Sequence, residues 1–320
     1  MDFWTDKRTL VTGGDGFVGS HLVERLLRKN ANVLVVGRSE FPKRLNSELT
    51  FDYIQADLRE LDTCINISKN VDVVFHLASV VGGIGYNISH HADMFRLNSL
   101  LNLNMMEASR LNNVDRYQCT SSVCIYPREA ALPTPETEGF VDDPEPTVYG
   151  YGWAKRMAEI QAKLYASDYD MKISIIRPTN IYGPRDNFDP LTSHVIPAFI
   201  QKMYESTDTV IIWGSGNQTR SFIYVEDVVR AMMEITEKYT VADPVNIGTE
   251  EEIKINELAK MILRIFKKNL TLVFDKSRPE GQPRKFADIR KAKRVLKWEP
   301  EFSLETGLKK TIEWFKRVQS

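Results

Sequence analysis

The feature that most constrains this chain is a glycine-rich stretch near its N-terminus, Thr12-Gly13-Gly14-Asp15-Gly16-Phe17-Val18-Gly19. It follows a β-branched run at 8–12 and opens an amphipathic helical pattern. In such a unit Gly13 permits a tight turn, Gly16 lets backbone amides approach a pyrophosphate, and Gly19 lets the helix pack closely on the strand. The helix N-terminus also favours a bound anion. The context on both sides therefore predicts a dinucleotide-binding unit rather than a merely tight turn.

The first half of the chain alternates short β-branched runs with longer helical patterns. Strands are predicted at 8–12, 32–36, 51–56, 71–77, 116–121 and 172–177. Helices are predicted at 16–28, 92–111 and 151–166, with apolar residues spaced three and four apart. This alternation is typical of a Rossmann-type doubly wound parallel sheet in an α/β protein.

After residue 177 the pattern changes, because Gly, Pro and Asn interrupt 178–190. Short strands at 209–213 and 272–274 and helices at 255–266 and 304–318 follow. These indicate a smaller α/β C-terminal substrate lobe. We therefore assign 1–177, with a strand and helix of the first sheet at about 220–249, to a dinucleotide-binding domain. The second lobe takes about 178–219 and 250–320.

The composition of the chain limits which partners it can bind and indicates its cellular compartment. Lys and Arg number 42 against 43 Asp and Glu, so the formal charge of −1 provides no global field for nucleic acid or an anionic membrane. Cys64, Cys119 and Cys124 are odd in number and lack metal-ligand spacing, which favours a reducing compartment and no metal site. With no signal region and no apolar run of membrane-spanning length, a cytoplasmic location is expected.

Tyr151-Gly152-Trp153-Ala154-Lys155 places a phenol and an ammonium four residues apart, on one face of a helix. The lysine, with the charge of an oxidised nicotinamide, can lower the pKa of Tyr151 and make it a proton donor or acceptor during hydride transfer. The pattern alone is common in amphipathic helices. Its place one helix after a strand ending in Ser121-Ser122 favours catalysis, with the Ser122 hydroxyl bonding the reacting oxygen.

The end of the second strand bears on the choice of cofactor. It reads Val36-Gly37-Arg38-Ser39, with Arg38 where an acidic residue would bind ribose hydroxyls. A guanidinium there suits a 2′-phosphate and favours NADP(H). NAD(H) stays open, because Arg38 is equally explained as a solvated cation and Asp15 is unfavourable to a nearby phosphate. Asp57 is either an adenine contact or a helix cap.

In this order the glycine loop, Ser122 and the Tyr151–Lys155 pair resemble the extended short-chain dehydrogenase/reductase family over nearly the whole chain. The resemblance implies a nicotinamide dinucleotide between the two lobes. The residues expected to contact it are Gly13, Asp15, Gly16, Phe17, Val18, Gly19, Arg38, Asp57, Leu58, Leu77, Ala78, Asn98, Tyr151, Lys155, Pro178, Asn180 and Ile181.

Three stretches, at 81–85, 121–127 and 177–188, are similar to the GDP-L-fucose synthases of that family, and the likeness continues to 279–285. It implies epimerisation of a GDP-4-keto-6-deoxy sugar at carbons 3 and 5 and reduction of carbon 4 with NADPH. Cys124 and His194 match the acid/base pair. Protons beside a ketone are acidic enough for a thiolate or imidazole, and inversion needs groups on both faces.

Alternatives remain at these positions. Cys124 is otherwise a small buried apolar residue and His194 a helix cap or core histidine. GDP-mannose 3,5-epimerase shares the serine and cysteine motif, but its second base is expected to be a lysine where this chain has His194. The glycine loop with Asp15 is more like that of NAD-retaining epimerases. The absence of an acidic residue at 123 and 124 disfavours dehydratases and decarboxylases.

The resemblance also suggests how the substrate is held. The predicted substrate-binding residues are Gly83, Ser122, Asn180, His194, Lys202, Trp213, Arg220, Arg278 and Lys285. Arginine suits a diphosphate and Trp213 could wall the base or the sugar. A homodimer is expected, because helices 92–111 and 151–166 carry more apolar positions than one sheet face covers, and relatives pair them in a four-helix bundle.

Overall fold

The computed structural model describes residues 2–189, 192–277 and 281–319, and a seven-stranded sheet lies at its centre. The strand order is β10-β6-β5-β4-β1-β2-β3, and every neighbouring pair is parallel. The strands are β1 Arg8–Thr12, β2 Asn32–Gly37, β3 Asp52–Gln55, β4 Val73–His76, β5 Arg116–Thr120, β6 Ile173–Pro178 and β10 Val245–Ile247. The predicted doubly wound sheet is confirmed, with strand ends within two residues of those predicted.

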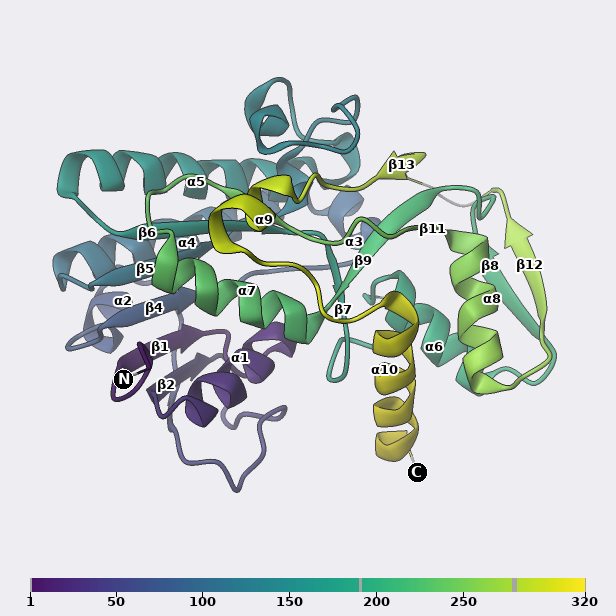
Figure 1. The fold of residues 1–320 in the computed structure, drawn as a ribbon, viewed down its shortest axis with the longest axis horizontal. Helices are drawn as coiled ribbons and strands as arrows, with labels where there is room; N and C mark the ends of the chain where they lie inside the picture. Colours follow the sequence, from purple (N-terminus) through teal and green to yellow (C-terminus); the bar gives the residue numbers. More distant parts are fainter. Residues whose placement is uncertain (1, 190–191, 278–280, 320) are drawn as a thin grey trace.

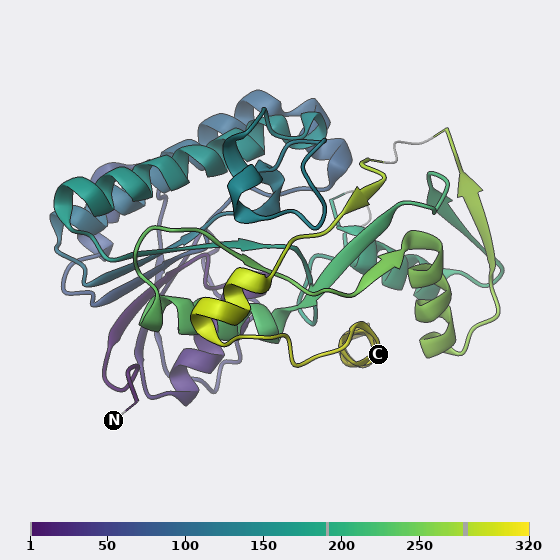
Figure 2. The same cartoon turned by 45° about the horizontal axis from the view of Figure 1, so that its top comes forward.

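Helices cover both faces of this sheet (Figures 1 and 2). Helices α1 (Phe17–Arg28) and α7 (Val225–Lys238) lie on one face, and α2 (Leu61–Ile67), α4 (His91–Leu111) and α5 (Tyr149–Tyr169) lie on the other. The strand sequences explain this. Successive side chains of a strand point to opposite faces, and neighbours such as Leu10 and Val11 are both fully buried. A run that is apolar at consecutive positions therefore needs a cover on each side.

A smaller lobe lies beyond the carboxyl ends of the central strands (Figure 1). It contains a four-stranded sheet of β7 Asn180–Tyr182, β9 Thr219–Tyr224, β11 Glu252–Lys254 and β13 Arg284–Lys285, and a parallel pair of β8 Thr209–Trp213 and β12 Thr271–Asp275. Its helices are α6 Val195–Glu205, α8 Ile255–Phe266 and α10 Leu304–Gln319. Two short helices pack on the first lobe: α3 Ile84–Ser89 beside α4 and α5, and α9 Arg290–Leu296 against β10 and α7.

One strand lies elsewhere than the sequence suggested. The strand expected to return to the first sheet near residue 220 is β9, and it pairs with β7, β11 and β13 instead. The edge beside β6 is taken by β10, whose backbone groups satisfy those of β6. Helix α7 does return to the first sheet, so the chain crosses into the smaller lobe at β7, back at α7 and again into the smaller lobe at β11. It then returns to the first sheet at α9 and ends in the smaller lobe with α10.

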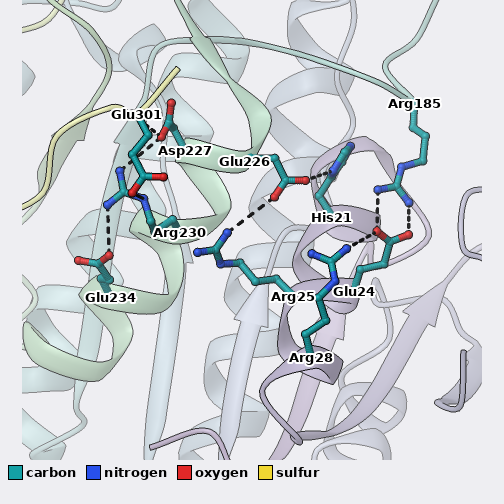
Figure 3. A network of polar contacts seen from close by, with 10 residues as sticks. All are labelled: His21, Glu24, Arg25, Arg28, Arg185, Glu226, Asp227, Arg230, Glu234 and Glu301. Carbon is teal, nitrogen blue, oxygen red and sulfur yellow. Dashed lines mark hydrogen bonds and ion pairs between the residues drawn. The ribbon is translucent and has the colours of Figure 1, made fainter. Parts of the chain in front are cut away.

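Polar contacts fasten the smaller lobe to the helix that follows the glycine loop (Figure 3). His21 of α1 donates from Nε2 to the Pro184 carbonyl oxygen at 2.9 Å. Its Nδ1 lies 2.8 Å from a carboxylate oxygen of Glu226 of α7. Arg185 bonds Glu24 of α1, with one of its two bonds at 3.2 Å. Helix α1, and with it the glycine loop, therefore has a fixed position against the segment that leads into the smaller lobe.

Candidate active site

A cavity of about 1310 Å³ lies between the two lobes, at the carboxyl ends of the central strands. Gly13 follows β1 and Leu77 and Ala78 follow β4, and both groups line it. In the sheet, β1 leads to β2 on one side and stands beside β4 on the other, which makes this the point where the strand order reverses. Ligands of open parallel sheets bind at such a point.

The glycine loop fits a dinucleotide. Gly13 has φ +67, and a Cβ there would lie 3.0 Å from the backbone nitrogen of Ala78. A Cβ on Gly19 would lie 2.2 Å from the Gly13 carbonyl oxygen, so α1 could not approach the loop with any side chain there. The N-terminus of α1, beginning at Phe17, is thereby turned to the cavity. These features suit the pyrophosphate of a dinucleotide.

The adenosine end of the site combines charges of both signs. Arg38 and Asp15 both line the cavity. The Asp15 carboxylate leans against the end of β2, since a Cβ on Gly37 would lie 2.5 Å from its Oδ1 and 2.6 Å from the Tyr53 hydroxyl. Burial, then Asp15, raises the pKa of Tyr53. The end of β2 itself has no acidic residue to bind ribose hydroxyls, but the carboxylate of Asp15 in the glycine loop lies at that place.

Asp57 lies in the cavity lining with Leu58 and is ion-paired. Hydrogen bonds from the Arg59 side chain and backbone lower the pKa of Asp57 to about 2. The alternative of a helix cap is wrong, because α2 begins at Leu61 with Glu60 in the N-cap position. Asp57 is thus an ionised acceptor at the edge of the cavity.

Tyr151 and Lys155 stand one turn apart on α5 and line the cavity floor. Lys155 is 2% exposed, its Nζ donates to the Thr120 carbonyl oxygen at 2.9 Å, and it lies 5.5 Å from the centre of the Tyr151 ring. Burial lowers the pKa of Lys155 to about 8. Burial, with a smaller contribution from Cys124, raises the pKa of Tyr151 well above its usual range. In the protein alone Tyr151 is therefore a protonated donor. The predicted lowering toward neutrality also relies on the charge of an oxidised nicotinamide, and it stays a prediction.

Ser122 and Cys124 follow β5 in a short 3-10 turn, Val123–Ile125. Both are partly exposed to the cavity, while Ser121 and Val123 are buried. The Ser122 Oγ accepts a hydrogen bond from the Cys124 backbone N–H at 3.1 Å. Cys124 is close enough to Tyr151 and Lys155 for its charge to act on the pKa of both.

The thiols of the other two cysteines are expected to be unreactive. Cys64 and Cys119 are free and buried, and desolvation raises the pKa of each thiol to about 12. A thiol with such a pKa holds almost no thiolate near neutrality. Of the three cysteines, Cys124 is the one that the structure presents to the cavity.

His194 reaches the same cavity from the smaller lobe. It occupies the N-cap position of α6, but its side chain makes no capping hydrogen bond, so capping does not explain it. The Gly83 backbone N–H donates to the Thr192 carbonyl oxygen at 3.2 Å, which packs the 81–83 stretch beside it. The imidazole contacts cavity solvent yet is surrounded by protein, and this desolvation lowers the pKa of His194. The neutral ring that results can accept a proton.

The predicted substrate residues of the smaller lobe gather on one wall. Lys202, Trp213, Arg220 and Lys285 all line the cavity, as do Gly83 and Asn180. Lys202 donates from Nζ to the Ile211 carbonyl oxygen at 3.2 Å and lies 5.9 Å from the Trp213 ring centre. Arg278 lies outside the described residues. Gln282, which the sequence did not single out, also lines the wall, and its carbonyl oxygen accepts from Arg220 at 2.7 Å.

Among the predicted site residues that the structure describes, Asn98 alone is not part of the cavity lining. It is buried on α4, where its Oδ1 accepts from the Ser79 hydroxyl at 2.6 Å and from the Val80 backbone N–H at 2.8 Å. It therefore holds the turn after β4, and its contact with the dinucleotide stays a prediction. Ser79 does line the cavity, beside Tyr151. Pro178 and Ile181 line it as predicted.

Among residues 2–189, 192–277 and 281–319, no group of three or more His, Cys, Asp or Glu is placed to hold a metal ion. Within the same ranges no helix has both the length and the apolar character needed to cross a membrane.

The dinucleotide cradle and the serine, tyrosine and lysine beside it define an α/β enzyme with a nicotinamide cofactor. The sequence profile of the NAD dependent epimerase/dehydratase family matches residues 9–248, and the chain belongs to that family. It is 33% identical to GDP-mannose 3,5-epimerase of Arabidopsis thaliana over 98% of this chain and 84% of that protein. It is 32% identical to GDP-L-fucose synthase of Escherichia coli (strain K12) over 97% of this chain and 96% of that protein.

The fold comparison agrees with the family. UDP-glucose 4-epimerase from Thermotoga maritima, solved with UDP-glucose, matches with a TM-score of 0.90 and 30% identity over 98% of this chain and 100% of that chain. The extended short-chain dehydrogenase resemblance drawn from the motifs is therefore confirmed.

Proposed function

We propose that the protein is a nucleotide-sugar epimerase-reductase of the GDP-L-fucose synthase type. It inverts carbons 3 and 5 of a GDP-4-keto-6-deoxy sugar and then reduces carbon 4 with NADPH. The observation that carries the proposal is one cavity lined by Ser122, Tyr151 and Lys155 from the first lobe and by both Cys124 and His194. Relatives named GDP-L-fucose synthase, 32% and 33% identical, support a nucleotide-sugar epimerase or reductase.

The residues divide the chemistry by position. Cys124 and His194 come from different lobes, so one can remove the proton beside the keto group and the other can return a proton to the opposite face. The hydroxyls of Ser122 and Tyr151 bond the carbonyl oxygen as negative charge develops on it. Bound NADPH supplies the hydride for carbon 4. Tyr151, protonated in the buried site, then gives its proton to oxygen 4.

The nucleotide diphosphate needs local cations, because the whole chain has a formal charge of −1. Arg220 and Lys285 stand side by side as register neighbours of β9 and β13, and both line the cavity. Together with Lys202 they supply the positive charge that a diphosphate requires. Trp213 provides a flat apolar wall for the base or the sugar.

The test uses GDP-4-keto-6-deoxy-mannose and purified protein. We expect one NADPH oxidised for each sugar converted. Cys124→Ser and His194→Gln should slow deuterium uptake from solvent at carbons 3 and 5 at least a hundredfold, whereas the buried Cys119→Ser control should not. Wild-type protein that consumes no NADPH, or exchanges no deuterium, contradicts the proposal.

A second candidate is an epimerase that keeps its cofactor bound and returns the hydride, with no net reduction. Asp15 beside Gly37 favours it, because a carboxylate there suits ribose hydroxyls and opposes a 2′-phosphate. The relative named GDP-mannose 3,5-epimerase is 33% identical. An absorbance spectrum of freshly purified protein separates the two. Stoichiometric bound cofactor with no NADPH consumption selects the epimerase.

We propose further that the protein is a homodimer joined through α4 and α5. The two helices leave apolar side chains exposed on their outer surfaces, including Phe95 at 39%, Ile160 at 43% and Leu164 at 54%. A second copy of the same face would cover them. Light scattering should give a dimer, and Ile160→Glu with Leu164→Glu should give a monomer, whereas Val318→Glu on α10 should not. A monomeric wild type refutes the dimer.

A further inference from the structure

The stretch that carries Ser122 and Cys124 is held by hydrogen bonds to Lys155, which lines the cavity, and to buried side chains outside the cavity lining. We call residues 120–126 the catalytic segment. Lys155 bonds the carbonyl oxygen of residue 120, and Arg156 donates to that of Ile125 from Nε at 3.0 Å and from Nη2 at 2.7 Å. Between these points, the hydroxyl of the buried Ser121 donates to Glu159, which is not part of the cavity lining. The segment is thus bonded along its buried side.

Glu159 and Arg177 are the centre of this support. Glu159 is fully buried, and it lies one turn beyond Lys155 on α5, so the two side chains share a helix face. Arg177 of β6 is 1% exposed and bonds Glu159 twice, Nε to Oε1 at 2.8 Å and Nη2 to Oε2 at 2.6 Å. Among the described residues that line the cavity, neither appears. Any effect on the reaction must pass through other residues.

The arginine also reaches the far end of the catalytic segment. Its Nη1 donates to the Tyr126 hydroxyl at 2.9 Å, and that hydroxyl donates to the Asn246 Oδ1 of β10 at 2.6 Å. The Asn246 Nδ2 in turn donates to the Thr134 carbonyl oxygen at 3.0 Å. Buried polar bonds therefore hold the segment near both ends, at Ser121 and at Tyr126, while Ser122 and Cys124 between them face the cavity.

A buried ion pair is a costly way to stabilise a core, because the desolvation of two charges cancels much of their attraction. What such a pair provides is direction, since a forked guanidinium and a carboxylate fix each other's position and that of their hydrogen-bond partners. We infer that Glu159 and Arg177 form a positioning pair that sets where Ser122 and Cys124 stand relative to Tyr151 and Lys155. The inference rests on the proposed function for its kinetic consequence only.

The expected effect falls on the chemical steps. Loss of either anchor lets Ser122 and Cys124 move against the rigid helix that carries Tyr151, and a misplacement of about 1 Å costs roughly a hundredfold in rate. The nucleotide is held by the other lobe, so KM should change little. A purely structural role would lower the melting temperature without this separation of kcat from KM.

Two variants cut one anchor each and leave the ion pair whole. Ser121→Ala removes the bond to Glu159, and Tyr126→Phe removes the bonds to Arg177 and Asn246. Ser174→Ala is the matched control: it removes a buried hydroxyl of β6 that lies 3.1 Å from a threonine hydroxyl of α7, away from the segment. We expect each anchor variant to lose tenfold or more in kcat with KM within twofold, and the control to keep both within twofold.

A third variant, Arg177→Lys, tests the Glu159–Arg177 pair itself. Arg177→Lys keeps the buried charge but cannot span both Glu159 oxygens and the Tyr126 hydroxyl. In protein that circular dichroism shows to be folded, we expect a loss of kcat at least as large as that of Tyr126→Phe. Wild-type kcat in folded Arg177→Lys and in both anchor variants overturns the inference.

A second readout does not depend on the substrate. The rate of iodoacetamide alkylation at Cys124, followed by mass spectrometry from pH 6 to 9, reports the position and surroundings of this thiol. In Ser121→Ala and Tyr126→Phe, we expect the alkylation rate to differ from that of wild type at least threefold at one or more pH values in this range. In Ser174→Ala, we expect the rates to match those of wild type throughout. If wild type lacks epimerase-reductase activity but the profile responds, the proposed function fails and the positioning pair stands. If the profile and kcat are both unchanged in the anchor variants, the positioning pair fails.

Discussion

Lys155→Met should make the protein more stable while removing its activity. Lys155 is 2% exposed, and burial lowers its pKa from an ordinary 10.5 to about 8, so at pH 7 the folded protein contains a poorly solvated charge. That shift corresponds to about 3 kcal/mol. Methionine has a similar length and no charge, but it gives up the bond to the Thr120 carbonyl oxygen, which costs about 1 kcal/mol. The expected net gain in unfolding free energy is about 2 kcal/mol at pH 7.

The stability difference between Lys155→Met and wild type should depend on pH. Because the folded-state pKa of Lys155 is below the unfolded value, the unfolded chain binds more protons between about pH 8 and 10.5, and wild type gains stability as pH rises through this window. The advantage of Lys155→Met should therefore be complete below pH 8, and by pH 10.5 the lost hydrogen bond should leave the variant about 1 kcal/mol less stable than wild type. Urea unfolding of cofactor-free protein across this range measures it. The exposed Lys163→Met on the same helix should differ from wild type by less than about 0.5 kcal/mol throughout.

A Lys155→Met variant that is less stable than wild type at pH 7 refutes the reasoning. So does a stability difference that stays constant between pH 8 and 10.5, because the gain would then not come from the lysine charge. A variant with wild-type turnover would show that Lys155 is not needed beside Tyr151.

Three further outcomes are expected. Tyr151→Phe removes the proton donor and should slow hydride transfer by roughly 10²- to 10⁴-fold in stopped-flow measurements, and an unchanged rate would exclude the phenol from the reaction. Asp15→Asn removes the charge beside Gly37, so calorimetry should show the affinity for NADP⁺ relative to NAD⁺ rising about tenfold; an unchanged ratio would place the 2′ position elsewhere. Gly19→Ala puts a Cβ 2.2 Å from the Gly13 carbonyl oxygen. It should lower the melting temperature and abolish dinucleotide binding. Wild-type values for both would contradict the close approach of α1 to the loop.

Much of the first lobe could be predicted from local sequence. The glycine loop, the apolar strand runs and the four-residue step from Tyr151 to Lys155 each act through neighbours in the chain, so their structural meaning is fixed by turn geometry and periodicity. Helices α2, α3, α6 and α9 were not predicted. Three of them have only six or seven residues, and α6 has a proline at its third position, so none gives a strong periodic signal.

The misplacements have a common cause. Strand β9 has the composition of a central strand but pairs in the smaller lobe, because β10, more than twenty residues later, takes the free edge beside β6. Asn98 has the position of a cofactor ligand, yet its amide bonds the turn after β4. In both cases, the hydrogen-bond partner is decided by which groups lie next to each other in the folded chain. The spacing of residues along the sequence does not contain that information.

The sequence by itself determined the class of the protein, because a glycine-lined turn between a strand and a helix can be read wherever it occurs. Only the tertiary structure decided that Cys124 and His194, 70 residues apart, line one cavity, and that Asp15 leans on the end of β2. The same holds for Glu159 and Arg177, whose pairing behind the catalytic segment joins a helix to a strand. Such contacts form when distant segments pack together, and packing, unlike periodicity, leaves no local trace in the chain.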